Sequence, residues 1–163
     1  MSRGKKETLG EKARQIGLLL IFLPFLLPLV LIGLALFFAY RAVLYLLVWT
    51  LWLPRGKRIL LVYSDSTIWR DYFVNEMIPL LEDSAVILNW SERKQWPKWS
   101  LEVRIFRNFG GRANFNPLVL VFHPLRPVEQ FRFWEPFKYW KKGNTEPVER
   151  MKRNMLDYLQ LRY

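Results

Sequence analysis

Two short clusters of polar side chains stand directly behind apolar runs that we predict to be strands, residues 59–63 and 85–89. In an open parallel sheet, ligands bind outside the carboxyl ends of the strands, so both clusters are expected to line one crevice. A helix that begins just after the first run would also offer free N–H groups to a phosphate. We therefore predict a site for a nucleotide or another phosphate ligand here. The residues expected in it are Ser64, Asp65, Ser66, Thr67, Asn89, Ser91, Glu92 and Arg93, and also His123, which follows a third predicted strand.

The first cluster also has a purely structural interpretation. Asp65 and Ser66 are residue types that commonly cap the N-terminus of a helix. The turn contains no glycine, and neither G-x-G-x-x-G nor a P-loop is present, so close approach of the backbone to a pyrophosphate is hindered. Helix capping is the favoured interpretation, and ligand binding is the alternative.

His123 is the only histidine, and it follows a third apolar run, residues 118–122. Together with Asp65 it is the candidate for general acid–base chemistry. A triad of Ser66, His123 and Asp65 can be written down, but no G-x-S-x-G elbow supports it, and adjacent residues are poorly placed to contact opposite sides of one imidazole. With no cysteine and one histidine in the chain, we predict no metal site and no cofactor. Enzymatic activity is left open, and a non-enzyme is favoured.

Aromatic and basic side chains are densest in residues 131–142, and Trp96 and Trp99 form a second such patch. The side chains could bind nucleic acid, which we disfavour, or rest on a membrane or a partner protein. Alternatively, the phenylalanines complete the core while the lysines stay in water. The residues assigned to membrane or partner contact are Trp96, Trp99, Phe133, Trp134, Tyr139, Trp140, Lys141 and Lys142.

The elements that must position these residues alternate between strand and helix. Runs that are apolar at every residue are typical of strands buried on both faces. The alternation predicts the α/β class: a small three-layer, Rossmann-like or flavodoxin-like domain over residues 55–163 with a mostly parallel sheet. Strands are expected at 59–63, 85–89, 118–122 and 129–134, and helices at 68–78 (stopped by Pro79), 101–109, 136–142 and 147–161.

An apolar run, Ile16 to Pro54, precedes this domain behind a basic tail of residues 1–15, and Arg41 is its only charge. As one helix it would be about 58 Å long, nearly twice the roughly 30 Å hydrocarbon core of a bilayer. It either doubles back near Gly33 as a hairpin, or crosses once and continues as an interfacial helix. Because both flanks are basic, the hairpin is favoured, with the domain on the cytoplasmic face. The residues of the interfacial alternative that share one helix face, and so contact the membrane, are Arg41, Tyr45, Trp49 and Trp52.

The net charge of +11 at pH 7 points to anionic partners. A basic protein held at a bilayer meets anionic lipid headgroups before it meets nucleic acid. We therefore expect a non-enzymatic accessory or scaffold protein of a bacterial-type inner membrane, whose further partner is a membrane protein complex or another copy of itself in a homo-oligomer. The alternative is a membrane-tethered sensor or enzyme that uses the crevice for a nucleotide or phosphate ligand.

Overall fold

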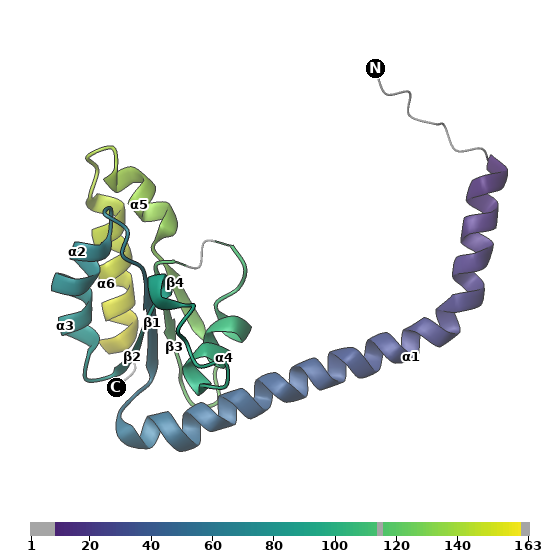
Figure 1. The fold of residues 1–163 in the computed structure, drawn as a ribbon, viewed down its shortest axis with the longest axis horizontal. Coiled ribbons are helices and arrows are strands. Elements are labelled where there is room, and N and C mark those ends of the chain that lie inside the picture. The colour runs from purple at the N-terminus through teal and green to yellow at the C-terminus, as the bar shows by residue number, and fades with distance from the viewer. Residues whose placement is uncertain (1–8, 114–115, 161–163) are drawn as a thin grey trace. The chain divides into compact units, whose positions relative to one another are not determined.

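The computed structural model describes residues 9–113 and 116–160, with side chains for residues 10, 24–113 and 116–159. The chain divides into two compact units, residues 1–42 and residues 43–163, which are described separately (Figure 1). The boundary between them lies inside the apolar run, before the change in composition at Pro54.

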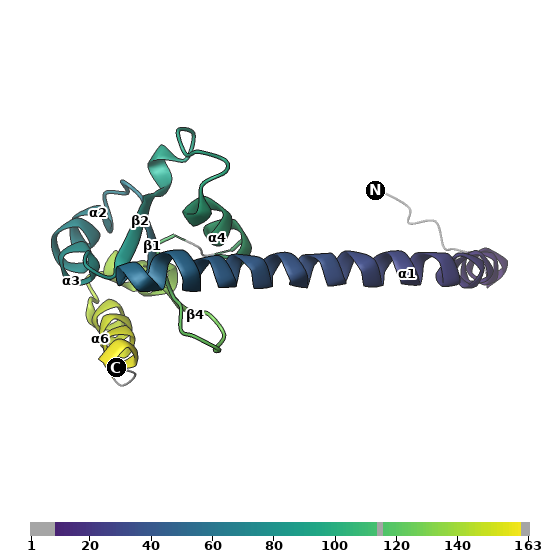
Figure 2. The same ribbon diagram turned by 90° about the horizontal axis from the view of Figure 1, so that it is seen from below.

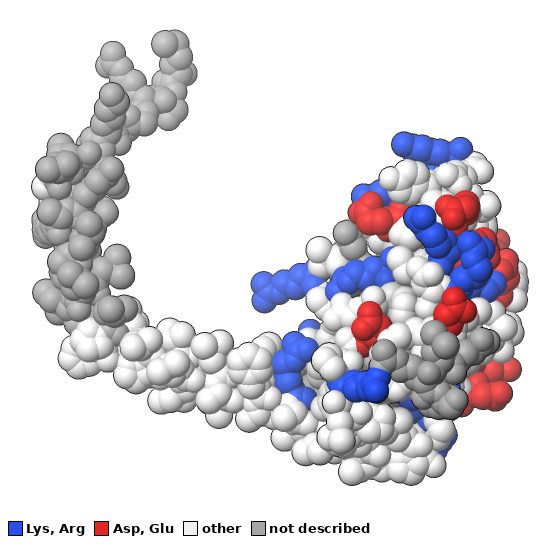
Figure 3. Space-filling model, turned by 180° about the vertical axis from the view of Figure 1, so that it is seen from behind, with Lys and Arg blue, Asp and Glu red and all other residues white. Residues whose placement is uncertain are grey.

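The first unit is built on helix α1, Leu9–Leu47, whose last residues belong to the second unit. The helix continues without a turn through Gly33, so the expected hairpin is wrong. A lone glycine is tolerated within a helix, and a helix satisfies its own backbone hydrogen bonds in an apolar medium. No charged residue occurs from Pro24 to Tyr40, and the described part of this stretch is uncharged in Figure 3, whereas acidic and basic side chains mix over the second unit. Among the described residues, one helical stretch, Pro24–Arg55, is long and apolar enough to cross a membrane.

The second unit contains a mixed four-stranded sheet with the strand order β2-β1-β3-β4. β1 pairs in parallel with β2, but β3 runs antiparallel to β1 and β4 runs antiparallel to β3. The expected mostly parallel, Rossmann-like sheet is therefore wrong, while the α/β class holds. Because helices cover both faces of the sheet, each inner strand is apolar on both faces whether it runs parallel or antiparallel to its neighbour. The composition of a strand therefore does not reveal its direction. The strands are β1 (Ile59–Tyr63), β2 (Ala85–Asn89), β3 (Leu118–Val121) and β4 (Glu129–Arg132).

Alternate residues of each strand face two separate cores. Ile59 and Leu61 of β1 face a core formed with α2 (Arg70–Tyr72), α3 (Ile78–Leu81), α5 (Trp134–Trp140) and α6 (Glu146–Gln160). Leu60 and Val62 face the other core, which contains α4 (Leu101–Phe109). The two helical layers lie on opposite sides of the sheet in Figures 1 and 2.

The second core also contains the end of the apolar run. Leu44, Val48 and Trp52 are buried against the sheet together with Phe122. These residues come from the end of α1 and from a π-helical turn, η1 (Val48–Trp52), which a 3₁₀ turn, η2 (Leu53–Arg55), follows. The last part of the predicted anchor is thus a helix of the α/β domain.

Two prolines in the second unit lie inside helical segments, just after a widened turn. The N–H of Leu53, before Pro54, donates to the carbonyl of Val48, and the N–H of Ile78, before Pro79, donates to that of Phe73 in the π-helical turn η3 (Phe73–Met77). A widened turn accommodates both the clash of the proline ring with a carbonyl of the preceding turn and the missing N–H of proline. Pro79 therefore does not stop the helix as expected.

Candidate functional site

The parallel pairing of β1 and β2 brings the two polar clusters together at one end of the sheet. The backbone N–H of Asp65 donates to the Ser91 hydroxyl at 2.9 Å. The Asn89 side-chain amide donates to both Asp65 carboxylate oxygens at 3.1 Å. The predicted crevice residues of these two strands are therefore neighbours in the fold.

Within this cluster the polar groups satisfy one another. The Asn89 amide also lies 3.4 Å from Glu92 Oε1, and its side-chain oxygen accepts from the Ser91 N–H at 3.0 Å. Arg70 Nε lies 3.5 Å from the Asp65 carboxylate. These contacts close the ends of both strands, which is a structural role.

The turn after β1 does not form the expected helix start at Ser66 or Thr67. The Ser66 carbonyl accepts from the N–H groups of Trp69 and Arg70, and the regular helix begins at Arg70. The Ser64 hydroxyl is buried and accepts from the Trp69 indole N–H at 3.1 Å, while Thr67 is exposed. The side chains after β1 thus fix a turn and do not present helix N–H groups to a phosphate.

His123 lies at the opposite end of the sheet from Asp65. Because β3 is antiparallel to β1, the residues after β3 lie beside the start of β1, where the Phe122 N–H donates to the Arg58 carbonyl at 2.9 Å. The structure therefore does not bring together the catalytic pair or the triad considered above. The His123 ring is buried, 5.3 Å from the Tyr158 ring, and burial together with the cations of Arg58 and Arg126 lowers its pKa below 6.5.

The aromatic segment 131–142 is mostly core. Phe133 and Phe137 are fully buried, the Trp134 ring packs on Trp69 at 5.6 Å, and the Trp140 ring packs on Tyr72 at 5.4 Å. Tyr139, Lys141 and Lys142 are exposed. Most rings of this segment therefore pack inside the domain, and Tyr139 is the aromatic side chain of its helix that is exposed.

A hydrogen-bonded pair holds the same core to α6. The Tyr72 hydroxyl donates to Glu149 Oε1 at 3.0 Å, and Lys152 lies over the Tyr72 ring at 5.3 Å and pairs with Glu76 at 2.8 Å. Burial and the Glu149 carboxylate raise the pKa of Tyr72 above its usual value of 10.0. These groups join the helical segment after β1 to α6.

The residues predicted to form an interfacial helix face have other contacts. The Arg41 guanidinium lies 5.6 Å from the centre of the Phe37 ring. Trp52 is buried in the second core, and Tyr45 and Trp49 are half-buried beside it. The Tyr45 hydroxyl donates to the carbonyl of His123 at 2.6 Å and lies against the carbonyl of Arg126.

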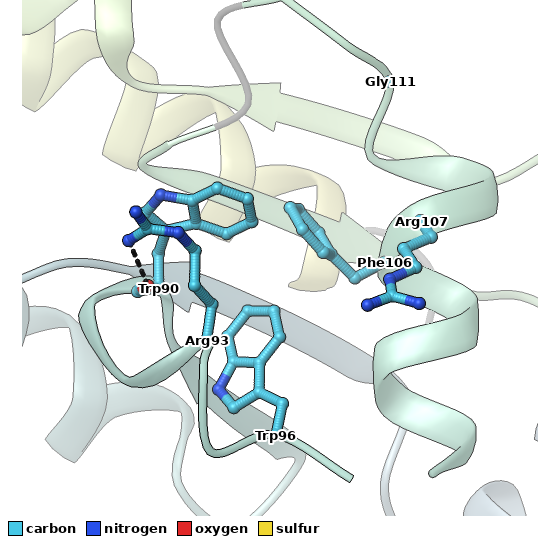
Figure 4. A pocket seen from close by; sticks show the side chains of 6 residues that line it. All are labelled: Trp90, Arg93, Trp96, Phe106, Arg107 and Gly111. Carbon is cyan, nitrogen blue, oxygen red and sulfur yellow. Dashed lines mark hydrogen bonds between the residues drawn. The ribbon is translucent and has the colours of Figure 1, made fainter. Parts of the chain in front are cut away.

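The domain contains a cavity of about 260 Å³ (Figure 4). It includes Arg93 and Trp96 from the predicted sites, but sequence reasoning missed its other members. Only the spacing of Trp90, Arg93 and Trp96, three residues apart, hints at a common face, because the remaining wall comes from α4 and the chain just after it. The lining residues are Trp90, Arg93, Trp96, Phe106, Arg107 and Gly111.

No protein family, curated protein or solved structure matches this chain at a significant level. Among the described residues, no group of three or more histidine and carboxylate side chains is positioned to hold a metal ion.

Proposed function

We propose that this chain is a membrane-anchored accessory protein whose α/β domain rests on the surface of the bilayer. The observation that supports this most directly is that the apolar helix ends inside the core of the domain. Leu44, Val48 and Trp52 are buried against the sheet. The apolar run extends in sequence to Pro54 and so includes these core residues, and a crossing helix would therefore keep the domain close to the headgroups.

The outer surface of this region has the composition of a membrane interface. Val43, Leu46 and Leu51 of this helical segment are 51%, 53% and 42% exposed. Leu125, in the turn between β3 and β4, is 87% exposed and has a φ of 58°, a strained value for a side chain of this size. Basic Arg126 follows it. Apolar side chains next to cations are the combination that binds anionic membranes.

Tyr45 connects the exposed helical segment to the turn that carries Leu125. Its hydroxyl donates to the carbonyl of His123 and lies against that of Arg126, and these two residues bracket the turn that carries Leu125. The turn is thereby held beside the helical segment that leaves the apolar stretch. Helix and turn together form one candidate surface for the bilayer.

Site-specific fluorescence tests this proposal. The chain has no cysteine, so single Leu125→Cys and Thr67→Cys variants of the full-length protein can be labelled with an environment-sensitive dye and reconstituted into vesicles that contain anionic lipid. Thr67 is an exposed residue just beyond the carboxyl end of β1, opposite the end where Leu125 lies. We expect a blue-shifted emission and strong quenching by spin-labelled lipid at position 125, and neither at position 67. Equal, weak quenching at both positions would exclude a docked domain.

The same proposal assigns the domain an accessory role beside a membrane protein complex or a second copy of the chain. Extraction in mild detergent followed by co-purification tests this part separately. A defined complex or homo-oligomer is expected, and a monodisperse monomer without a partner would contradict it.

A further inference from the structure

The cavity beside β2 combines an aromatic wall with two cations. Three rings form the wall: Trp90 lies 5.7 Å from Trp96 and 5.5 Å from Phe106, and Trp96 lies 5.9 Å from Phe106, all edge to face. Phe106 is buried, whereas both tryptophans are half-buried. The indoles therefore bring flat apolar surface to the cavity while the phenylalanine supports them from the core.

The cations come from two different elements. Arg93 follows the 3₁₀ turn η4 (Trp90–Glu92), lies 5.0 Å over the Trp90 ring and donates to the Trp90 carbonyl at 3.2 Å. Arg107 is exposed on α4, on the other side of the cavity in Figure 4. Among the residues that the structure describes, no carboxylate pairs with either guanidinium. The nearby Glu92 is already bonded to Asn89.

We propose that this cavity binds a mononucleotide, or a ligand of the same chemistry: one flat heteroaromatic ring that carries a phosphate. A ring can stack on an indole face regardless of its exact identity, and a guanidinium matches phosphate in geometry and charge. A volume of about 260 Å³ lies just below the usual range of sites for drug-sized ligands, so one ring system fits and a dinucleotide does not. The site is built by different residues from the membrane-facing surface and is independent of docking to the bilayer.

Calorimetric titration of the full-length protein in detergent micelles tests this proposal, with adenosine and uridine 5′-monophosphate as probes. Saturable binding of at least one of them is expected. Adenosine, which lacks the phosphate, and inorganic phosphate, which lacks the ring, should each bind at least tenfold more weakly. Arg107→Gln and Arg93→Gln should each weaken nucleotide binding at least tenfold, and Trp96→Leu should weaken it as well.

The same part of the chain supplies matched controls. The guanidinium of Arg104, also on α4, lies 4.8 Å over the ring of Trp99, which is 82% exposed and not part of the cavity. Arg104→Gln and Trp99→Leu should leave the affinity unchanged. Circular dichroism checks that each variant is folded. If Arg93→Gln does not fold, Arg107→Gln alone tests the proposal, because Arg107 is exposed and its replacement should not disturb the fold.

Three results would overturn the proposal. One is the absence of saturable binding of either nucleotide at millimolar concentration. Another is an equal loss of affinity in Arg104→Gln and Arg107→Gln, which would indicate a general charge effect. The third is binding of inorganic phosphate or of short-chain phosphatidic acid as tight as that of the nucleotides, which would make the site one for phosphate or for a lipid headgroup without a ring.

Discussion

Asn89 uses its whole side chain to join the ends of the two parallel strands. Its amide donates to Asp65 and Glu92, and its oxygen accepts from the Ser91 N–H. Residue types alone left a ligand site open beside the structural interpretation, because carboxylates, hydroxyls and amides serve strand-end turns and ligands equally well. What distinguishes the two uses is whether the groups are already paired, and here they are paired with one another.

His123 should make the stability of the domain depend on pH. Its folded-state pKa is lowered by burial and by the cations of Arg58 and Arg126, while in the unfolded chain it stays near 6.5. The unfolded state then binds a proton that the folded state does not, so the free energy of unfolding falls as the pH drops below 6.5 and levels off below the folded pKa. We expect His123→Gln to reduce this loss between about pH 7 and pH 5, measured by urea unfolding. Identical slopes in both proteins would contradict the burial of a neutral imidazole.

At the scale of elements, the segment from Val43 to Arg55 has two different faces. One face packs on the sheet through Leu44, Val48 and Trp52, and the other carries exposed Val43 and Leu46. Both faces are apolar, so hydropathy alone predicts that the segment continues the membrane span. Its packing shows instead that one face of the segment covers the sheet of the α/β domain.

Two alanine variants should separate these faces. Trp52→Ala removes a side chain that is 6% exposed and should lower the free energy of unfolding by about 3–5 kcal/mol, the usual cost of truncating a buried tryptophan. Leu46→Ala, on the outer face, should change it by less than about 0.5 kcal/mol. Denaturant titration in detergent micelles measures both, and equal small effects would mean that Trp52 faces lipid.

The strands and helices were largely predictable, but their arrangement was not. Residues 59–63 and 85–89 form the two parallel strands as expected, and residues 101–109 form the expected helix, because buried strands and amphipathic helices have clear patterns. The direction of β3 was missed, and with it the place of His123, since a strand covered on both faces is apolar in either orientation. The cavity was missed for a related reason, because its wall depends on which helix packs next to which loop.

For the whole molecule, a single helix changes the expected topology. The cytoplasmic location of the domain was inferred from a hairpin that would put both basic flanks on one side. If the helix crosses a membrane once, the N-terminal tail and the domain would lie on opposite sides of it. The tail, positions 1–15, holds five basic and two acidic residues, and the remaining chain carries 20 basic and 12 acidic residues. Both flanks of the helix are therefore positively charged, and the positive-inside rule does not say which of them faces the cytoplasm.

Single-cysteine labelling in intact cells tests this topology, since the chain has no native cysteine. We expect Ser2→Cys and Lys94→Cys to react from opposite sides with a membrane-impermeant maleimide: one before permeabilisation and the other only after it. The pair also orients the domain, because the position that reacts first is the one outside. Labelling of both positions under the same condition would restore the hairpin.

The burial of Trp52 against the sheet also bears on how the protein is made. Residues 44–52 leave the ribosome before any strand, whereas their neighbours in the core, Leu118, Leu120 and Phe122, are synthesised much later. Until then, the strand residues that bury these side chains in the folded domain do not exist. We expect the segment to be delivered to the membrane first and drawn onto the sheet afterwards, so that maturation includes a late withdrawal from lipid as well as an early insertion.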